Sequence, residues 1–228
     1  MRFVLFGFLL VSVLATLQIE GLCQTVAAGA PIRYEPFFPA KWRANYQSTK
    51  MVPWEGERGV LLTLDDQLEP QTMAVFLRRL DAGWELYDKL IGQKPLPFKT
   101  HRNKVTIAAV PSPSFTCGMG CGHLGRTGIE VAGFYRSHHH RGSGDYEGVR
   151  NHPKEFAHYY FYEMGRNYYL FGDRHNLFTT GFAVFMRCVC MDTRECIDPD
   201  IAAFPTRSWM ESDLKTTMET QFIRAIRT

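Results

Sequence analysis

The sequence lacks a strong excess of charge of either sign. Lysine and arginine number 26 and aspartate and glutamate number 23, which leaves a formal net charge of +3. So small an excess argues against nucleic acid as a partner, because phosphate backbones are bound through clustered positive charge. Charged residues are 21% and hydrophobic residues 45% of the chain, which excludes collagen-like and disordered classes. We expect a folded protein that binds no nucleic acid.

Long apolar runs are also scarce, and the longest lies at the start of the chain. Arg2 precedes an apolar stretch over residues 3–17, and Gly21 and Cys23 follow closely. A basic start, a short apolar stretch and a small residue at position −3 are typical of a secretory signal peptide, here residues 1–23. The alternative is an uncleaved membrane anchor, although the stretch is short for spanning a bilayer. We expect a secreted, extracellular protein that has no membrane association after cleavage and begins near Gln24.

Cysteines are few, and five of the six would remain in the secreted chain. Pairs are expected in an oxidising compartment. Cys117 and Cys121 flank a Gly-Met-Gly turn, and we favour a disulfide between them over a zinc knuckle that includes His123. The other three cysteines allow one further pair, whose connectivity cannot be read from spacing: Cys188, Cys190 and Cys196.

Hydrophobic patterning divides the secreted chain into an arm and a domain. Residues 24–58 are rich in proline and aromatic residues and predict an extended arm that wraps a domain formed by residues 59–228. Within the domain, short apolar runs predict strands, and apolar spacing of three and four residues predicts helices. The predicted strands are residues 59–64, 104–110 and 128–134, and the predicted helices are residues 70–91, 153–170, 178–191 and 211–228. Strands come first and helices later, so the expected fold class is α+β.

The helix at residues 70–91 has the most regular pattern. Pro70 suits the first turn of a helix, and Gly92 suits its C-terminal cap. Asp65 and Asp66 precede the helix, and we expect them to cap it rather than to bind a cation.

Three segments together resemble the gluzincin metallopeptidases, the thermolysin-like zinc proteases, and most of all the secreted relatives of the plant basic secretory proteins. They are the helix that leads into Gly92-Gln-Lys-Pro95, the segment Tyr162-Glu-Met-Gly-Arg-Asn167, and the segment Thr180-Gly-Phe-Ala-Val-Phe185. The corresponding family features are a helix before a Gly-x-x-Pro turn, a His-Glu-Met-x-His zinc helix and a Glu-Gly-Phe-Ala segment. The resemblance covers roughly residues 59–190. It implies a zincin-like fold, in which a small sheet packs on an active-site helix and further helices follow.

The resemblance also implies where zinc would lie in such an enzyme. Two His side chains one helical turn apart and a Glu from a following helix bind the metal, and a Glu beside the first His is the general base. Here Tyr162 and Arg166 occupy the His positions, Thr180 occupies the third-ligand position, and Glu163 keeps the base position. Arginine cannot coordinate zinc because it stays protonated. We expect no zinc or other cofactor, and a degenerate cleft lined by Tyr159, Tyr162, Arg166 and Thr180.

The degenerate site still contains an opposite-charge pair. Glu163 and Arg166 are three residues apart on the predicted helix and can form an ion pair. We expect the Arg166 guanidinium to replace the charge of the metal and to hold Glu163 structurally. We also expect the pair to be partly buried, because Tyr159, Tyr162 and Phe182 would crowd it.

A different set of residues could still bind zinc and support catalysis. Lys154-Glu-Phe-Ala-His158 also fits a His-Glu-x-x-His pattern with its first His lost, and it would supply His158 as a ligand. The tract from His138 to His140 could add ligands, although consecutive His residues in a Gly- and Arg-rich loop point in different directions. The chain would then be an active secreted metallohydrolase or peptidase with an unusual ligand set, and Glu163 would be its catalytic residue.

We favour a secreted, zincin-like pseudoenzyme that has a non-catalytic binding or structural role. Its cleft would take a peptide, a protein or a glycan, and nothing in the sequence chooses among them. The family follows its third-ligand helix with more helical material, so whether residues 59–228 form the whole domain stays open.

Overall fold

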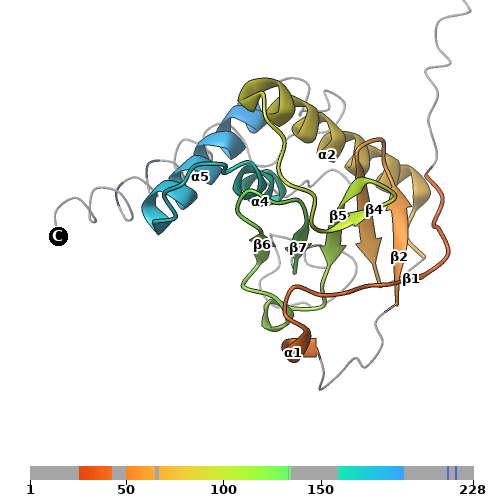
Figure 1. Ribbon diagram of the computed structural model, residues 1–228. Helices are drawn as coiled ribbons and strands as arrows, with labels where there is room; N and C mark the ends of the chain where they lie inside the picture. Colours follow the sequence, from red (N-terminus) through yellow and green to blue (C-terminus); the bar gives the residue numbers. More distant parts are fainter. Residues whose placement is uncertain are drawn as a thin grey trace, which may run out of the picture.

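The structure is a computed structural model that describes residues 26–42, 50–64, 67–132, 134 and 159–192, together with Lys215 and Glu219. Several predicted features lie outside the described residues: the signal peptide at residues 1–23, the His138–His140 tract, His158 and Cys196. Figure 1 shows helices α2, α4 and α5 gathered on one side of the molecule and the short helix α1 on the opposite side.

Helices and strands follow one another irregularly along the described chain. In chain order they are β1 (Ile32–Arg33), α1 (Pro39–Trp42), β2 (Lys50–Glu55), β3 (Gly59–Thr63), α2 (Pro70–Ile91), β4 (Thr100–His101), β5 (Lys104–Ala109), the 3₁₀ turn η1 (Pro113–Phe115), β6 (Gly120–Gly122), β7 (Ile129–Val131), α4 (Tyr159–Asn167) and α5 (Asn176–Asp192). Helices and a mixed sheet confirm the predicted α+β class.

The strands form one mixed sheet in the order β1-β2-β3-β5-β7-β6, with β4 paired to β5. β3, β5 and β7 are parallel to one another, and β6 pairs antiparallel with β7 at one edge. The three predicted strands correspond to β3, β5 and β7. β1 and β2 come from the predicted arm at residues 24–58, which therefore contributes two strands to the sheet.

Side chains alternate between the two faces of this sheet, and both faces are covered. One face packs against the helices and forms the larger apolar core, to which Leu61, Ile107 and Ile129 belong. The other face packs beneath the arm and forms a second cluster around Trp42 and Leu62. Since the arm covers the second face, alternate residues of the central strands are buried on both sides of the sheet.

Helix α2 has the predicted bounds and the predicted left-handed cap at Gly92. Its N-terminal cap is Glu69, whose carboxylate accepts hydrogen bonds from the backbone N–H groups of Gln71 and Thr72. Asp65 and Asp66, the predicted cap, lie outside the described residues.

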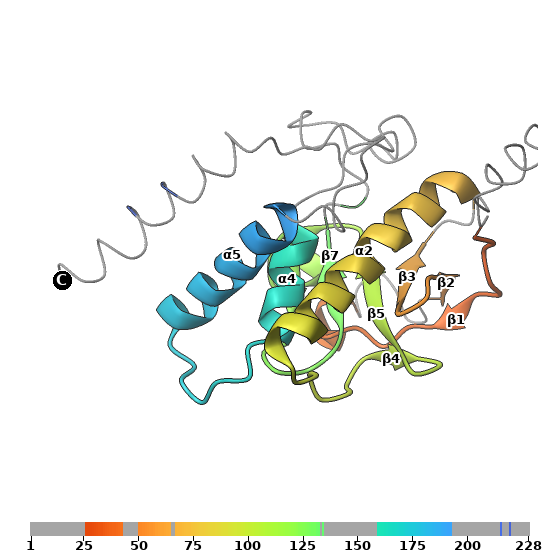
Figure 2. The same cartoon turned by 90° about the horizontal axis from the view of Figure 1, so that it is seen from above.

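The three long helices pack closely through small residues, and α4 lies between α2 and α5 (Figure 2). A Cβ atom on Gly83 of α2 would come 2.7 Å from the Phe161 ring of α4. A Cβ atom on Gly165 of α4 would come 3.0 Å from the Ala183 Cα of α5. α4 corresponds to the helix predicted at residues 153–170 and ends at Asn167, three residues earlier than predicted. α5 corresponds to the helix predicted at residues 178–191, and it begins two residues earlier and ends one residue later than predicted. Among the described residues, no helix combines the length and apolarity needed to cross a membrane.

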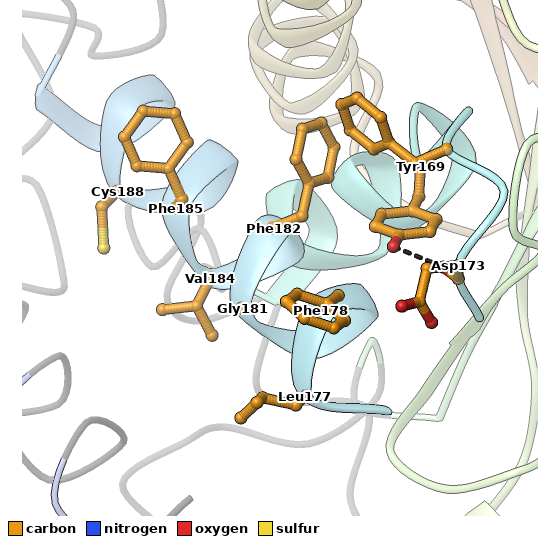
Figure 3. Close-up of a pocket in the computed structure, with 10 residues that line it drawn as sticks. Tyr169, Asp173, Leu177, Phe178, Gly181, Phe182, Val184, Phe185 and Cys188 are labelled. Atoms are coloured by element: carbon orange, nitrogen blue, oxygen red, sulfur yellow. Dashed lines mark hydrogen bonds between the residues drawn. The ribbon is translucent and has the colours of Figure 1, made fainter. Parts of the chain in front are cut away.

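The outer surface of α5 carries an apolar hollow of about 620 Å³, called the α5 groove below (Figure 3). It is lined by side chains from α5 and from the turn that precedes α5: Tyr169, Phe171, Asp173, Leu177, Phe178, Phe182, Val184, Phe185 and Cys188.

Candidate functional site

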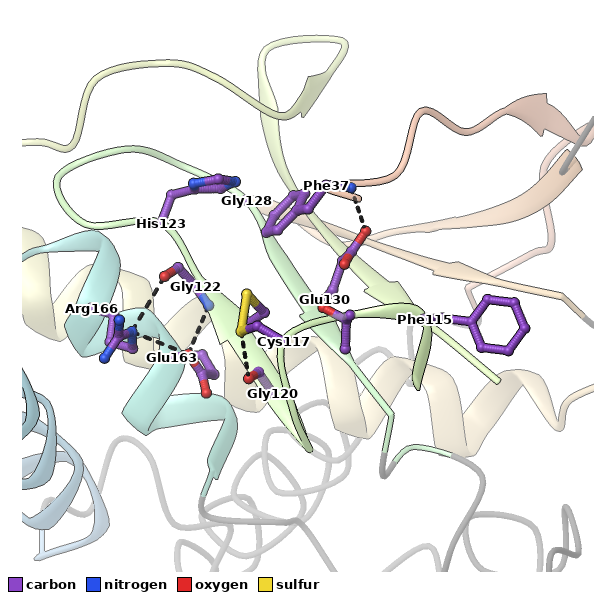
Figure 4. The surroundings of a disulfide bond; sticks show 12 residues. Phe37, Phe115, Cys117, Gly120, Gly122, His123, Gly128, Glu130, Glu163 and Arg166 are labelled. Carbon is purple, nitrogen blue, oxygen red and sulfur yellow. Dashed lines mark hydrogen bonds and ion pairs between the residues drawn. A yellow bond between two sulfur atoms is a disulfide. The ribbon is translucent and has the colours of Figure 1, made fainter. Parts of the chain in front are cut away.

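The polar residues of α4 lie where this helix meets the edge strand β6 (Figure 4). Helical spacing places Glu163, Arg166 and Asn167 on one face of α4, because residues three and four apart are neighbours on a helix. All three side chains bond the backbone of β6 or of the loop that follows it. The candidate site is therefore a junction between a helix and the edge of the sheet.

Gly122 is held at both of its backbone polar groups. Its N–H donates to Oε2 of Glu163 over 2.7 Å, and its carbonyl oxygen accepts from Nε of Arg166 over 3.3 Å. The same Arg166 nitrogen lies 3.7 Å from Oε2 of Glu163. Glu163, Arg166 and Gly122 thus form a closed triangle of polar contacts, which confirms the predicted ion pair and adds a partner from β6.

The close approach of Glu163 depends on two glycines of β6. A Cβ atom on Gly120 would lie 2.6 Å from Oε1 of Glu163. A Cβ atom on Gly122 would lie 2.5 Å from the Glu163 carbonyl oxygen. A larger residue at Gly122 would collide with the backbone of α4, and one at Gly120 would displace the Glu163 side chain, so the two glycines allow the carboxylate to reach the strand.

Glu163 is almost fully buried, with 5% of its surface exposed. Burial raises the pKa of its carboxyl group to about 7, since the charged form loses its hydration, and the Arg166 charge and the Gly122 N–H oppose this shift. The Arg166 side chain is 25% exposed, so the pair is partly buried, as predicted.

Asn167 is the third polar contact of the junction and is fully buried. Its Nδ2 donates to the carbonyl oxygens of His123, over 3.0 Å, and Gly128, over 3.2 Å. The side chain therefore ties α4 to both ends of the loop that joins β6 to β7.

The predicted disulfide between Cys117 and Cys121 is confirmed, with the two Cα atoms 5.6 Å apart. Because both sulfurs are used in this bond, these cysteines cannot form a zinc knuckle with His123. Cys121 belongs to β6, so the disulfide closes a short loop directly before Gly122.

His123 packs instead between two aromatic rings. Its ring centroid lies 4.1 Å from that of Phe37 and 4.7 Å from that of Phe98. Burial lowers the pKa of His123, and the nearby charges of Lys99, Arg126 and Arg166 lower it further. A neutral imidazole held between Phe37 and Phe98 joins the arm to the β6–β7 loop.

Glu130 is a buried acid that sequence patterns did not single out. It pairs with Cys121 across the sheet and points to the arm side, opposite to Glu163. Its Oε1 accepts from the Tyr34 hydroxyl over 2.6 Å and from the Phe37 N–H over 2.8 Å. Burial raises the pKa of Glu130. The only sequence signal is a Glu inside a β-branched run, which is also typical of a solvent-facing strand position.

The other predicted cleft residues are less closely connected to Glu163. Tyr162 is half-buried, and the Arg187 guanidinium carbon of α5 lies 6.0 Å from its ring centroid. Oγ1 of Thr180 bonds Oδ1 of Asn176 on its own helix over 3.0 Å. Tyr159 is the first residue of α4, and its side chain is not among those described.

No group of three or more His, Cys, Asp and Glu side chains that could hold a metal occurs within the described ranges. The alternative ligands His138, His140 and His158 all lie outside those ranges. The structure therefore brings together Glu163 and Arg166 from the predicted site, and adds Gly120, Gly122 and Asn167 to them.

No family model, curated protein or solved structure matches this chain.

Proposed function

We propose that this chain is a secreted, zincin-like protein with a degenerate peptidase site and a non-catalytic role. The observation that carries the proposal is the engagement of Glu163, the one residue that keeps its position in the zincin pattern. Its carboxylate is buried and bonded to the Gly122 N–H and to Arg166. A general base must come within hydrogen-bond reach of the water or substrate it deprotonates. A carboxylate that is covered by β6 does not meet this requirement.

Arg166 supports the same proposal from the metal side. Its guanidinium stands at the second His position of the pattern and is already bonded to Gly122 and Glu163. A fixed cation there supplies the positive charge that zinc would supply in an active enzyme. Because Glu163 and Arg166 both bond Gly122, the pair also attaches α4 to β6. The remaining role is binding, and we propose a peptide, a protein or a glycan as the partner, with neither nucleic acid nor a membrane involved.

The test is to measure zinc and hydrolysis together on mature protein purified from the culture medium. Elemental analysis should find far less than one zinc per chain, and peptide substrates should be cleaved no faster than in the buffer blank. Glu163→Gln is the matched control, because it removes the only candidate base while keeping a side chain of the same shape.

The alternative function is a metallohydrolase that uses His158, His138 and His140 as ligands. One observation favours it, namely that a carboxyl pKa of about 7 suits an acid–base catalyst at neutral pH. Stoichiometric zinc together with hydrolysis that disappears in Glu163→Gln would establish this alternative and overturn the proposal.

A further inference from the structure

Three aromatic side chains of the α5 groove are largely exposed. Phe178 and Phe185 on α5 are 52% and 61% exposed, and Phe171 in the preceding turn is 57% exposed. Figure 3 shows Phe178 and Phe185 projecting from α5. Asp173 is the only charged residue among those that line the groove. A contiguous apolar patch of a few hundred Å² is often functional, whereas single exposed apolar residues need no explanation.

The size of the groove restricts its occupant. If a whole phenylalanine side chain offers about 200 Å², the three side chains together expose about 340 Å². A stable complex between separate proteins buries about 800 Å² on each partner. A segment of the same chain needs much less, because its tether holds it at an effective concentration in the millimolar range. The groove therefore favours a tethered segment over a second copy or another protein.

The chain carries a suitable segment downstream of α5. Leu214, Met218, Phe222 and Ile226 recur at four-residue intervals and would form one apolar stripe on a helix. Lys215 and Glu219, the residues of this segment that the structure describes, are exposed and helical. They follow the first two stripe residues by one position and so fall beside the stripe rather than within it.

Helix and linker lengths agree with this assignment. Residues 211–228 as a helix would be about 27 Å long, and α5, with 17 residues, is about 26 Å long. Residues 193–210 could extend over roughly 60 Å, more than is needed to return from the end of α5 to its start.

We propose that residues 211–228 dock as an amphipathic helix in the α5 groove, with the stripe of Leu214, Met218, Phe222 and Ile226 against Phe171, Phe178 and Phe185. In this arrangement the apolar side chains of the stripe and those of the groove are removed from solvent by contact with each other. This inference is independent of the function proposed above.

Amide hydrogen exchange on the complete mature chain tests the docking. Amides of residues 211–228 should exchange at least 10-fold more slowly than in a free peptide of the same sequence. Phe185→Asp should abolish that protection and leave α2 protected. Leu90→Asp is the matched control, because Leu90 is 51% exposed on α2 and lies outside the groove, and it should leave residues 211–228 protected.

If Phe185→Asp also exposes α2, the reciprocal variant Phe222→Asp gives the answer, since it should release residues 211–228 without affecting α2. Absence of protection in the unsubstituted chain would overturn the proposal. So would protection that survives both substitutions. Protection that appears only at concentrations where sedimentation detects a dimer would assign the groove to a second copy and would equally overturn it.

Discussion

The backbone N–H of Gly122 donates to Oε2 of Glu163 over 2.7 Å, and this bond joins the edge strand β6 to helix α4. Arg166 completes the contact by bonding the carbonyl oxygen of the same glycine. An edge strand leaves backbone groups unpaired, and here two side chains of one helix satisfy both groups of Gly122. Glu163 and Arg166 thus stabilise the end of the sheet.

Removing Arg166 should destabilise the protein. Arg166→Ala leaves a buried carboxylate without its cation and Gly122 without one hydrogen bond, and at pH 8 we expect a loss of about 2 kcal/mol in the free energy of unfolding. Urea denaturation measures this change. Adding Glu163→Gln should recover part of the loss, and a double-mutant cycle should give a coupling of at least about 1 kcal/mol.

Arg102→Ala is the matched control for that cycle. Arg102 pairs with Glu55 over 2.8 Å, but its side chain is 73% exposed. An exposed pair contributes under about 1 kcal/mol. If Arg166→Ala costs no more than Arg102→Ala, or if Arg166→Ala and Glu163→Gln are additive, the structural role assigned to the Glu163–Arg166 pair is wrong.

Stability should fall as the pH rises through neutrality. The pKa of Glu163 is raised to about 7 in the folded state, from 4.5 for an ordinary Glu. The folded state therefore binds a proton that the unfolded state has released, and the contribution of Glu163 is fully present below about pH 4.5 and lost as the pH rises through 7. Relative to Glu163→Gln, the free energy of unfolding of the protein should fall by about 2 to 3 kcal/mol between pH 5 and pH 8.

Urea titrations of the two proteins at several pH values give that difference, and other groups that titrate cancel in the comparison. The same shift makes the Arg166→Ala effect larger at pH 8 than at pH 5, because the ion pair requires an ionised Glu163. Parallel pH profiles for the protein and Glu163→Gln would show that Glu163 titrates normally.

The disulfide should contribute to stability through β6. Replacing both cysteines, in Cys117→Ser with Cys121→Ser, frees a short loop directly before Gly122 and should cost about 2 kcal/mol. The exchange of the Gly122 amide should also become faster, because β6 loses its constraint. A thiol reductant should reproduce both effects in the unsubstituted protein. An unfolding midpoint that does not respond to the reductant would contradict this role.

Local patterns predicted the elements that local interactions determine. The bounds of α2 follow from its apolar spacing, from Pro70 and from the cap at Gly92, all of which lie within one stretch of chain. β6 is not among the predicted strands, because Gly-Cys-Gly has no alternation and its strand conformation comes from pairing with β7.

The candidate site divides in the same way. The Glu163–Arg166 pair is local and follows from a spacing of three residues on a helix. Gly122 is 41 residues away from Glu163 in sequence, and no local pattern indicates that contact. Glu130 could not be predicted for the same reason. The flanking Ile129 and Val131 predict a strand, but Glu130 is buried because the arm covers its face of the sheet and Tyr34 bonds its carboxylate.

Restoring the zincin ligands tests whether this helix corresponds to a zinc helix. The triple variant Tyr162→His, Arg166→His, Thr180→Glu places two imidazoles one turn apart on α4. Thr180 shares a helical face with Ala183, which packs against Gly165 of α4, so the new carboxylate would be directed toward α4. We expect zinc binding that the unsubstituted protein lacks, measured by competition with a chelating dye. Loss of the Arg166 bonds should lower the melting temperature of the variant, and zinc should raise it again because the metal binds only the folded state.

The double variant without Thr180→Glu is the control and should bind zinc at least 10-fold more weakly. A folded triple variant that binds no zinc would show that α4 is not the counterpart of a zinc helix, and the zincin resemblance would have to be abandoned.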